Sequence, residues 1–555
     1  MSKVLKKLSF ADIIILFALI FNAGFNEYVS CVITIFTTAY LFYRIIKNKA
    51  IQFNLNLFTI SIFLISITYG LTAIWAIDSG MAFIGFLKFL PLSLYLLVLQ
   101  QNIKVHILNV LPLFAAVLTV VSLVGMCIGF TKDFFSVAGR LAGFFQYPNT
   151  FALFLLVCEL LIITKEKLKI LDYLYLIILI AGLLYTGSRM IFVIALCANL
   201  VILILKIKDS KNKRYYLIAF LILSLTAIVV LIFNKDILNR YMSISVLEST
   251  FIGRILYWFD ALPLLIKYPF GMGYLGYSYI QTDIQTGVYT VQYIHNDFLQ
   301  LLLDIGWIPT IFFSIAIIHI LFKRKIPFSK KIIISSICVH SFFDFNLQFI
   351  AIFMLLIVLC NDEKGKVIVV DKKLWSICGV LILILLTSIY MGVHLLLSAF
   401  YKQDIAQKMY PYNTENMISI LENATDLQIA NDIADKIIEQ NEFTYIPYSV
   451  KSKYYFSVGD INNFIDYKHI AFEKNPFNYE EYEEYCSMLI SCISKYNTMG
   501  DKTSKDFCIN ELIEAKERLE GNEELLSTLG TKIKDQPKTR LSDDLLYYIN
   551  RFSEE

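Results

Sequence analysis

The chain has 555 residues, of which 57% are hydrophobic and 17% are charged. A soluble domain of average usage carries more charge and less apolar surface, so this composition excludes an ordinary soluble protein. The net charge of +3 combines two unlike parts: residues 401–555 hold 28 acidic and 17 basic residues, whereas residues 1–400 hold 18 acidic and 32 basic residues. The basic residues are scattered over short loops, so nothing indicates nucleic-acid binding.

Apolar runs of about 18 or more residues recur as far as about residue 400, which predicts transmembrane helices. No cleavable signal peptide is expected, because the first apolar run lacks a small-residue cleavage site and a second span follows at once. The predicted fold class is therefore all-α: a polytopic membrane helical bundle of about 12–13 transmembrane helices and a C-terminal α-helical repeat domain. The predicted spans are 8–25, 28–46, 57–77, 81–99, 105–130, 149–164, 170–187, 190–206, 215–233, 298–322, 332–344, 347–360 and 374–399.

The distribution of lysine and arginine over the short loops predicts the orientation of the chain. Alternate loops are basic, and they contain Lys3, Lys6, Lys7, Arg44, Lys47, Lys49, Lys104, Lys165–Lys169, Lys206–Arg214 and Lys323–Lys331. The N-terminus is therefore expected in the cytoplasm, and the loop 234–297 outside it. Segment 332–360 could form one long helix or a hairpin of two short ones. The charge rule favours the hairpin, which also puts the tail 401–555 outside.

The tail changes to polar sequence with helical periodicity. Its turn-like landmarks Tyr410-Pro411-Tyr412-Asn413, Ile446-Pro447-Tyr448 and Asn475-Pro476-Phe477-Asn478 recur at intervals close to those of a helical-hairpin repeat. This spacing resembles the tetratricopeptide pattern loosely. An irregular α-helical domain is the alternative.

The stretch Phe251–Gly306 interrupts the apolar pattern with a long, polar and aromatic segment. A loop of this length between spans is usually functional or disordered, and its aromatic content argues against disorder. We expect it to form a lid and half of the active site of a membrane enzyme.

Several polar residues near span ends on this side are candidates for that site, because charged groups at membrane depth are costly. They are Arg140, Asn149, Arg189, Arg254 and His295. Arginine side chains bind phosphate oxygens bidentately. A histidine can take the proton of an attacking hydroxyl. The set therefore predicts a site for a phosphate-bearing donor and a hydroxyl acceptor. No cofactor is expected.

Each candidate also has a structural interpretation. Arg189 could be a snorkelling interface residue, Arg254 could pair with Asp260, and His295 could simply begin a helix. Asn296 and Asp297 are common helix caps. His340 and Asp344 lie four residues apart, which predicts one helical face, where they form either a structural hydrogen-bonded pair or part of the substrate-binding site.

Gly271, Gly273 and Gly276 spell G-x-G-x-x-G, but no strand precedes them. The dinucleotide-binding interpretation requires a βαβ unit, so it is rejected here. We expect Gly271 and Gly273 to allow a tight backbone path beside the donor.

Taken together, these motifs resemble the O-antigen ligase and O-antigen polymerase superfamily. The resemblance covers roughly residues 1–400 and rests on Arg140 with Tyr147-Pro148-Asn149, Ser188-Arg189, the segment from Gly253-Arg254 to Trp258, Pro269-x-Gly-x-Gly, His295-Asn296-x-Phe-Leu and His340-x₃-Asp344. Asp304 stands where relatives often have glutamate.

The resemblance implies a metal-independent, inverting glycosyltransferase of the bacterial cytoplasmic membrane. Such an enzyme moves a glycan from a polyprenyl-pyrophosphate carrier to a glycan, lipid or protein acceptor outside the membrane. It implies that Arg189 and Arg254 hold the pyrophosphate and that His295 assists the acceptor, with Arg140, Asn149, Asn296, Gly271, Gly273, His340 and Asp344 as substrate-binding candidates. A helical-repeat tail occurs in some relatives.

Polymerase, ligase and protein O-oligosaccharyltransferase activities remain open from the sequence. Two further alternatives also remain: a flippase for the same lipid-linked glycan, and a scaffold in which the tail is the working part. Inverted internal repeats would indicate a transporter, and none is visible in the sequence.

Overall fold

The computed structural model describes residues 8–209, 213–361 and 365–554. The described residues do not include three lysines that support the predicted orientation, Lys3, Lys6 and Lys7. They also do not include residues 210–212 and 362–364, which lie in two of the predicted cytoplasmic loops. The prediction of an all-α fold is confirmed, since 75% of the structure is helical. The only strands of the described part form two antiparallel pairs, β1 (Ile51–Leu55) with β4 (Lys366–Val370) and β2 (Ser136–Val137) with β3 (Arg140–Leu141).

The chain forms two compact units, and neither unit is continuous in sequence. The first unit comprises Met1–Thr72, Phe83–Ser245 and Ile294–Leu396. The second comprises Ala73–Ala82, Val246–Tyr293 and Leu397–Glu555, so it unites most of the long polar loop with the tail.

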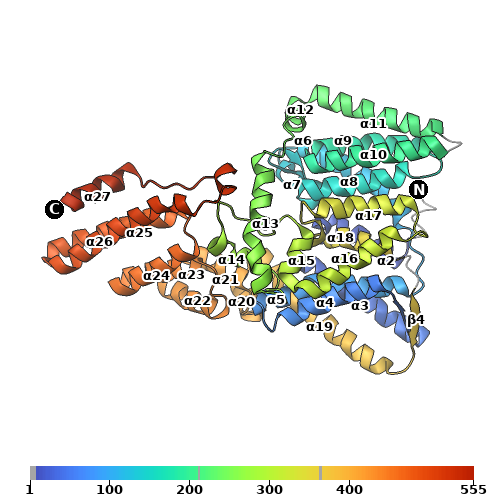
Figure 1. Ribbon diagram of the computed structural model, residues 1–555. Coiled ribbons are helices and arrows are strands. Elements are labelled where there is room, and N and C mark those ends of the chain that lie inside the picture. Colours follow the sequence, from blue (N-terminus) through green and yellow to red (C-terminus); the bar gives the residue numbers. More distant parts are fainter. Residues whose placement is uncertain (1–7, 210–212, 362–364, 555) are drawn as a thin grey trace. The chain divides into compact units, whose positions relative to one another are not determined.

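The first unit is a bundle of apolar helices (Figure 1). Its main helices are α2 (Phe10–Ile20), α3 (Glu27–Asn48), α4 (Leu57–Thr72), α5 (Ser79–Gln100), α6 (Ile107–Cys127), α8 (Pro148–Ile163), α9 (Ile170–Tyr185), α10 (Arg189–Asp209), α11 (Lys213–Phe233), α15 (Asp297–Ile305), α16 (Trp307–Phe322), α17 (Phe328–Ser341), α18 (Ile350–Cys360) and α19 (Leu374–Ala399). Short elements α7 (Lys132–Phe135), α12 (Lys235–Met242), η1 (Asn22–Gly24), η2 (Gly143–Phe145) and η3 (Asn346–Gln348) connect them.

Burial differs among these helices in the way that a membrane bundle requires. Nearly every residue of α8 and all of α18 are buried, so both helices belong to the core. In contrast, α10 and α11 expose many large apolar side chains, among them Leu200, Ile204, Leu221 and Val229. A helix that is apolar all round and exposed needs an apolar solvent, which indicates the lipid-facing side of the bundle.

Across the described residues, seven helices are long and apolar enough to cross a membrane: α3, α5, α6, α10, α11, α13 (Ser249–Lys267) and α19. Six shorter apolar helices accompany them: α2, α4, α8, α9, α16 and α18. The chain is thus a multi-pass membrane protein. The inclusion of α13 was not expected, because the sequence reading placed this segment in a polar loop; its mean hydropathy of 1.2 is the lowest of the seven.

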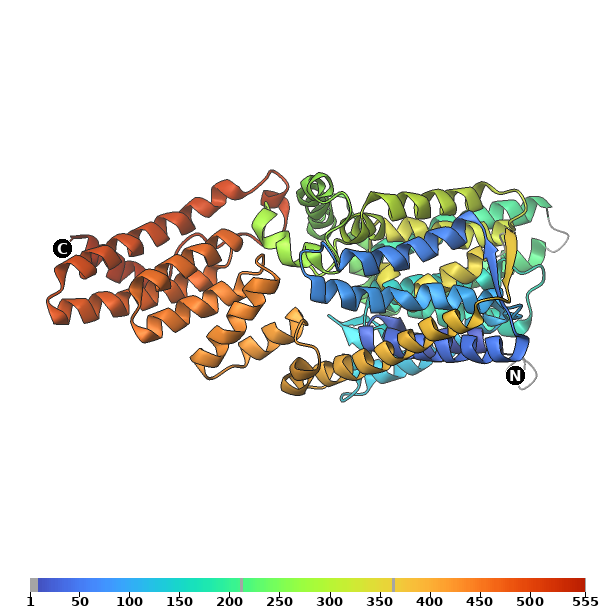
Figure 2. The same cartoon turned by 90° about the horizontal axis from the view of Figure 1, so that it is seen from below.

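Segment 332–360, which the sequence left open, forms two helices. Helix α17 ends at Ser341 and α18 begins at Ile350, with η3 between them. Strand β1 follows α3 and strand β4 follows α18, and the two strands pair from Ile51 with Val370 to Leu55 with Lys366 (Figure 2). The paired strands therefore lie at the same end of the bundle.

The second unit is also helical. It holds α13 and α14 (Gly276–Ile284) from the polar loop, and the tail helices α20 (Gln403–Met409), α21 (Thr414–Glu422), α22 (Leu427–Gln440), α23 (Ile446–Val458), α24 (Ile461–Lys474), α25 (Tyr479–Met499), α26 (Lys502–Gly521) and α27 (Asp543–Glu554). The pairs α22–α23, α23–α24 and α25–α26 pack along their lengths (Figure 2). Pro447 stands in the first turn of α23, and Pro411 and Pro476 lie between helices, as the landmarks predicted. The relation to tetratricopeptide repeats stays a prediction.

Candidate active site

A tight turn in the first unit collects arginine side chains. Helix α9 ends at Tyr185 and α10 begins at Arg189, which leaves Thr186-Gly187-Ser188 as the connection. Arg140 donates from Nε to the Thr186 carbonyl oxygen at 2.8 Å, and Arg240 donates from Nε to the Gly187 carbonyl oxygen at 2.8 Å. Gly187 has a φ of +58°, and a Cβ at this position would lie 2.8 Å from Cδ of Arg240. The turn therefore requires glycine for both its backbone conformation and the approach of Arg240.

Arg189 joins the same cluster from the first residue of α10. Its Nε donates to the Arg240 carbonyl oxygen at 3.2 Å, and its Nη2 donates to Ser243 Oγ at 3.3 Å. Helix α12, which carries Arg240, begins with Asn234 as N-cap, whose Oδ1 accepts from Ile237 N at 3.1 Å. Arg140 and Arg240 therefore converge on the turn, and Arg189 contacts the end of the helix that carries Arg240.

The electrostatics of this cluster favour an anion. The pKa of Arg140 is lowered to about 10, first by burial and then by the positive charge of Arg240. Arg140 is still charged at neutral pH, so the repulsion persists there. A bound pyrophosphate would relieve it, because arginine forks match phosphate oxygens.

A hydrogen-bond chain leads from Arg140 into the bundle. Arg140 Nη2 donates to Asn149 Oδ1 at 2.6 Å, and Asn149 Nδ2 donates to Asp344 Oδ2 at 2.7 Å. Asn149 lies in the first turn of α8, immediately after Pro148, whose fixed φ suits a helix start. Asn149 therefore connects the arginine cluster to a fully buried carboxylate.

Asp344 faces the candidate base. His295 Nδ1 lies 3.2 Å from Asp344 Oδ1, which also accepts from the Tyr147 hydroxyl at 2.8 Å and from Phe345 N at 3.0 Å. Asp344 is 0% exposed, whereas the His295 side chain is 21% exposed. An ionised carboxylate can only accept, so this contact assigns the hydrogen of a neutral His295 ring to Nδ1 and leaves Nε2 as the basic atom. The ring also packs edge-on against Phe345, with centroids 5.0 Å apart.

The segment that carries His295 is fixed by its neighbours. Asn296 is the N-cap of α15, and its Oδ1 accepts from Phe298 N and Leu299 N at 3.1 Å each. Both oxygens of the buried Asp297 accept from Leu347 N at 3.0 Å, which ties the start of α15 to the chain just after Asp344. His295 itself has a φ of +53°, a conformation that is uncommon outside glycine and occurs where surrounding structure enforces it.

The expectation that His340 and Asp344 share one helical face is wrong. Helix α17 ends at Ser341, so Asp344 lies in the connection to η3 and points its carboxylate at Tyr147, Asn149 and His295. His340 is fully buried, and its Nδ1 lies 3.0 Å from Asn346 Oδ1, which also accepts from Thr150 Oγ1. His340 therefore supports the loop that carries Asp344.

Arg254, Gly271 and Gly273 belong to the second unit. Arg254 lies in α13, and both glycines have left-handed φ values of +85° and +86° in the connection between α13 and α14. A Cβ at Gly273 would lie 2.5 Å from the Cβ of Ala76, so this glycine permits a close approach to segment 73–82. The convergence of Arg254 with Arg189 and His295 stays a prediction.

The model of the O-antigen ligase family matches residues 174–314. Over this segment, about a quarter of its length, the chain is similar to the O-antigen ligase family. No curated protein and no solved structure matches it. The matched segment includes Arg189, Arg240, Arg254 and His295, while Arg140, Asn149 and Asp344 lie outside the matched range.

Two residues of the candidate site were not predicted from the sequence. Arg240 was not singled out, although an arginine in the last turn of a short amphipathic helix at the edge of the polar loop was an available signal. Tyr147 was noted only as a neighbour of Asn149, yet its hydroxyl bonds Asp344 directly.

Proposed function

We propose that this protein is a glycosyltransferase that moves a glycan from a polyprenyl-pyrophosphate carrier to an acceptor outside the bacterial cytoplasmic membrane. The similarity of residues 174–314 to the O-antigen ligase family supports a glycan-processing membrane enzyme in general. The single observation that carries the finer proposal is the chain of contacts Arg140–Asn149–Asp344–His295, which joins the arginine cluster to an oriented histidine.

In the proposed reaction, Nε2 of His295 accepts the proton of the acceptor hydroxyl as the hydroxyl oxygen attacks the anomeric carbon of the donor. The bond between that carbon and the pyrophosphate oxygen breaks, and the polyprenyl pyrophosphate leaves with the electron pair. Attack from the face opposite the leaving group inverts the anomeric configuration. Asp344 keeps the histidine ring in the required tautomer and stabilises the imidazolium that forms, as the aspartate of a hydrolase triad does.

The arginine cluster has the complementary role. Negative charge on the pyrophosphate grows as the glycosidic bond breaks, and preorganised guanidinium groups stabilise that charge without reorganisation. Arg140, Arg189 and Arg240 would bind the pyrophosphate. The role in pyrophosphate binding that the resemblance implies for Arg254 stays a prediction. Because pyrophosphate is already a good leaving group, the reaction mainly needs stabilisation of its negative charge and deprotonation of the acceptor hydroxyl. The arginines would supply the first and His295 the second.

A flippase for the same lipid-linked glycan would also need cations near a lipid phosphate. It would have no use for a histidine held by a buried carboxylate, and the His295–Asp344 contact therefore favours a transferase. The acceptor is a second glycan, a lipid or a protein, and the charge rule predicts that the loop and the tail lie on the outer side of the membrane, where that acceptor is met.

The test is incubation of the purified protein in lipid nanodiscs with a lipid-linked oligosaccharide, without added nucleotide and with a chelator present. A longer lipid-linked product identifies a polymerase. Transfer to an added lipid or protein acceptor identifies a ligase or a protein O-oligosaccharyltransferase. Movement of the donor between leaflets without any covalent product would contradict the proposal.

A further inference from the structure

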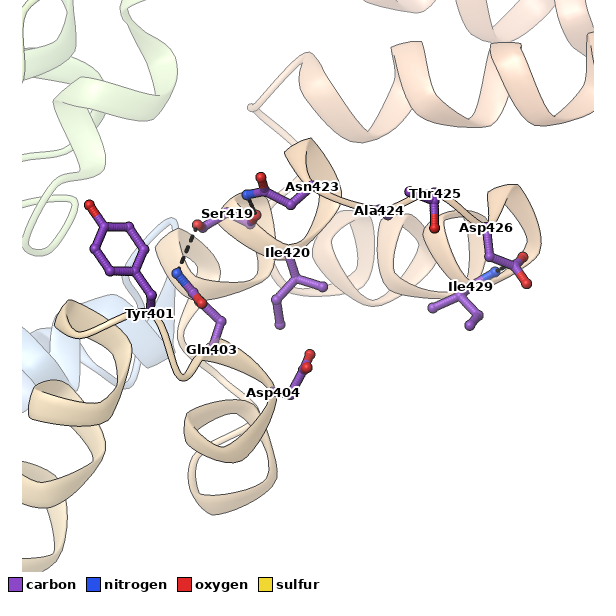
Figure 3. Close-up of a pocket in the computed structure, with 10 residues that line it drawn as sticks. All are labelled: Tyr401, Gln403, Asp404, Ser419, Ile420, Asn423, Ala424, Thr425, Asp426 and Ile429. Carbon is purple, nitrogen blue, oxygen red and sulfur yellow. Dashed lines mark hydrogen bonds between the residues drawn. The ribbon is translucent and has the colours of Figure 1, made fainter.

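The start of the tail contains a cavity of about 460 Å³ that the proposed reaction does not use (Figure 3). It lies within the second unit, between α20, α21 and the first turn of α22, beside the residues that follow α19. The lining residues are Tyr401, Gln403, Asp404, Ser419, Ile420, Asn423, Ala424, Thr425, Asp426 and Ile429.

The lining has a distinctive chemistry. Two amides, two hydroxyls and two carboxylates come from Gln403, Asn423, Ser419, Thr425, Asp404 and Asp426. Amides and hydroxyls both donate and accept hydrogen bonds, and carboxylates accept strongly from hydroxyl groups. Among the lining residues that the structure describes there is no lysine or arginine, so the cavity repels rather than binds phosphate.

Tyr401 adds an exposed aromatic face at the edge of the cavity. It is 85% exposed and has a φ of +58°, a costly backbone conformation for an aromatic residue. Ile420 and Ile429 project from the opposite side, with Ile429 55% exposed (Figure 3). An amphipathic ring beside such polar groups suits a ligand with apolar C–H faces and polar edges.

Several of the polar groups are held in place. Asn423 Nδ2 donates to the Ser419 carbonyl oxygen at 2.7 Å, and Gln403 Nε2 lies 3.5 Å from Ser419 Oγ (Figure 3). Asp426 caps α22 by accepting from Gln428 N at 2.8 Å and Ile429 N at 3.2 Å. Groups fixed by the protein lose less entropy on binding than mobile ones.

We propose that this cavity is a carbohydrate-binding subsite for an uncharged or amino-sugar glycan. Tyr401 stacks on a sugar ring, Asp404 and Asp426 accept from sugar hydroxyls or an amine, and Gln403 and Asn423 bridge neighbouring hydroxyls. The inference rests on the proposed function in one respect: the glycan bound here is the one that the enzyme transfers or extends. The subsite holds the glycan itself and makes no contact with the pyrophosphate.

The test is titration of the full-length protein in nanodiscs with the free oligosaccharide that mild acid releases from the lipid-linked pool of the source bacterium, followed by saturation-transfer NMR. Tyr401→Ala and Asp404→Ala should each weaken binding by about tenfold or more. Tyr547→Ala, which removes another exposed tyrosine in α27, should leave binding unchanged. Sodium pyrophosphate should not compete.

Binding that survives both cavity variants, binding abolished by pyrophosphate, or no binding by the wild-type protein would each overturn the inference. Failure of the proposed function gives a different result, because the binding assay needs no transfer. If the wild-type protein transfers no glycan but binds the oligosaccharide, and Tyr401→Ala loses that binding, the subsite is supported and the transferase proposal is contradicted. If His295→Ala loses transfer and keeps oligosaccharide binding, both stand.

Discussion

Asp344→Asn should separate the chemical role of the buried carboxylate from its structural one. Asparagine keeps the size of the side chain and removes the charge behind His295. One orientation turns the new amide NH₂ toward Asn149 Nδ2, which now donates to Asp344 at 2.7 Å, so two donors would face each other. The other orientation turns the NH₂ toward His295 Nδ1 and forces the ring hydrogen onto Nε2, the atom that must act as base.

Either orientation damages catalysis more than folding. The mispaired buried group should cost about 1–3 kcal/mol of stability. Loss of the correct tautomer and of the stabilised imidazolium should lower the transfer rate about 10²–10⁴-fold, equivalent to about 3–5 kcal/mol of barrier. The assay is single-turnover transfer from the lipid-linked donor, with thermal unfolding measured on the same preparation.

Asp304→Asn provides the matched control. Asp304 is also fully buried in the first unit, and it too accepts from a tyrosine hydroxyl and a side-chain amide, Tyr69 OH and Gln300 Nε2, each at 2.8 Å. Both variants should lose similar stability, but only Asp344→Asn should lose transfer. Equal losses of transfer in the two variants would show that Asp344 acts only through packing, which would refute the reasoning.

Three further predictions concern the arginine cluster, the membrane topology and the tail. Arg240→Lys should raise the donor KM about tenfold or more, because a point charge cannot replace the bidentate fork; an unchanged KM in steady-state assays would remove Arg240 from the donor site. Impermeant thiol reagents should label cysteines placed in 268–275 and in the tail of intact cells, and labelling of the loop alone would contradict the predicted hairpin topology. The pKa of His469 is raised, first by its hydrogen bond to Glu511. Protonated His469 therefore stabilises the tail fully below about pH 6.5, and this stabilisation declines as the pH rises through the folded pKa. Protection of the tail amides from hydrogen exchange should fall over this pH range in the wild-type protein and not in His469→Gln.

The sequence predicted the helical class because apolar runs of membrane length permit few other structures. Charge alternation also predicts Arg140, Asn149, Arg189 and His295 on one side of the membrane, and this topology stays a prediction. The structure joins Arg140, Asn149 and His295 through Asp344. The helical class was predictable because it depends on local pattern and on the cost of charge in lipid.

Other features depend on tertiary packing that no local pattern contains. The spacing of His340 and Asp344 predicted that both lie on one helix. Helix α17 ends at Ser341 and α18 begins at Ile350, so Asp344 lies in the connection, where it contacts Tyr147, Asn149 and His295. The polar loop was read as a lid, yet α13 and α14 form within it and belong to the unit that contains the tail. In the sequence, Arg240 looks like a solvent-exposed arginine. Its contact with the Gly187 carbonyl oxygen forms only when the chain folds.

The central claim is that His295 activates the acceptor while arginines hold the donor. The most direct measurement compares donor binding with glycan transfer in His295→Ala, using His319→Ala in α16 as the control for loss of an exposed histidine elsewhere in the same unit. The account predicts that lipid-linked donor binds with nearly wild-type affinity while transfer falls about 10²–10⁴-fold. Transfer by His295→Ala at the wild-type rate, or loss of donor binding with transfer retained at saturating donor, would contradict it.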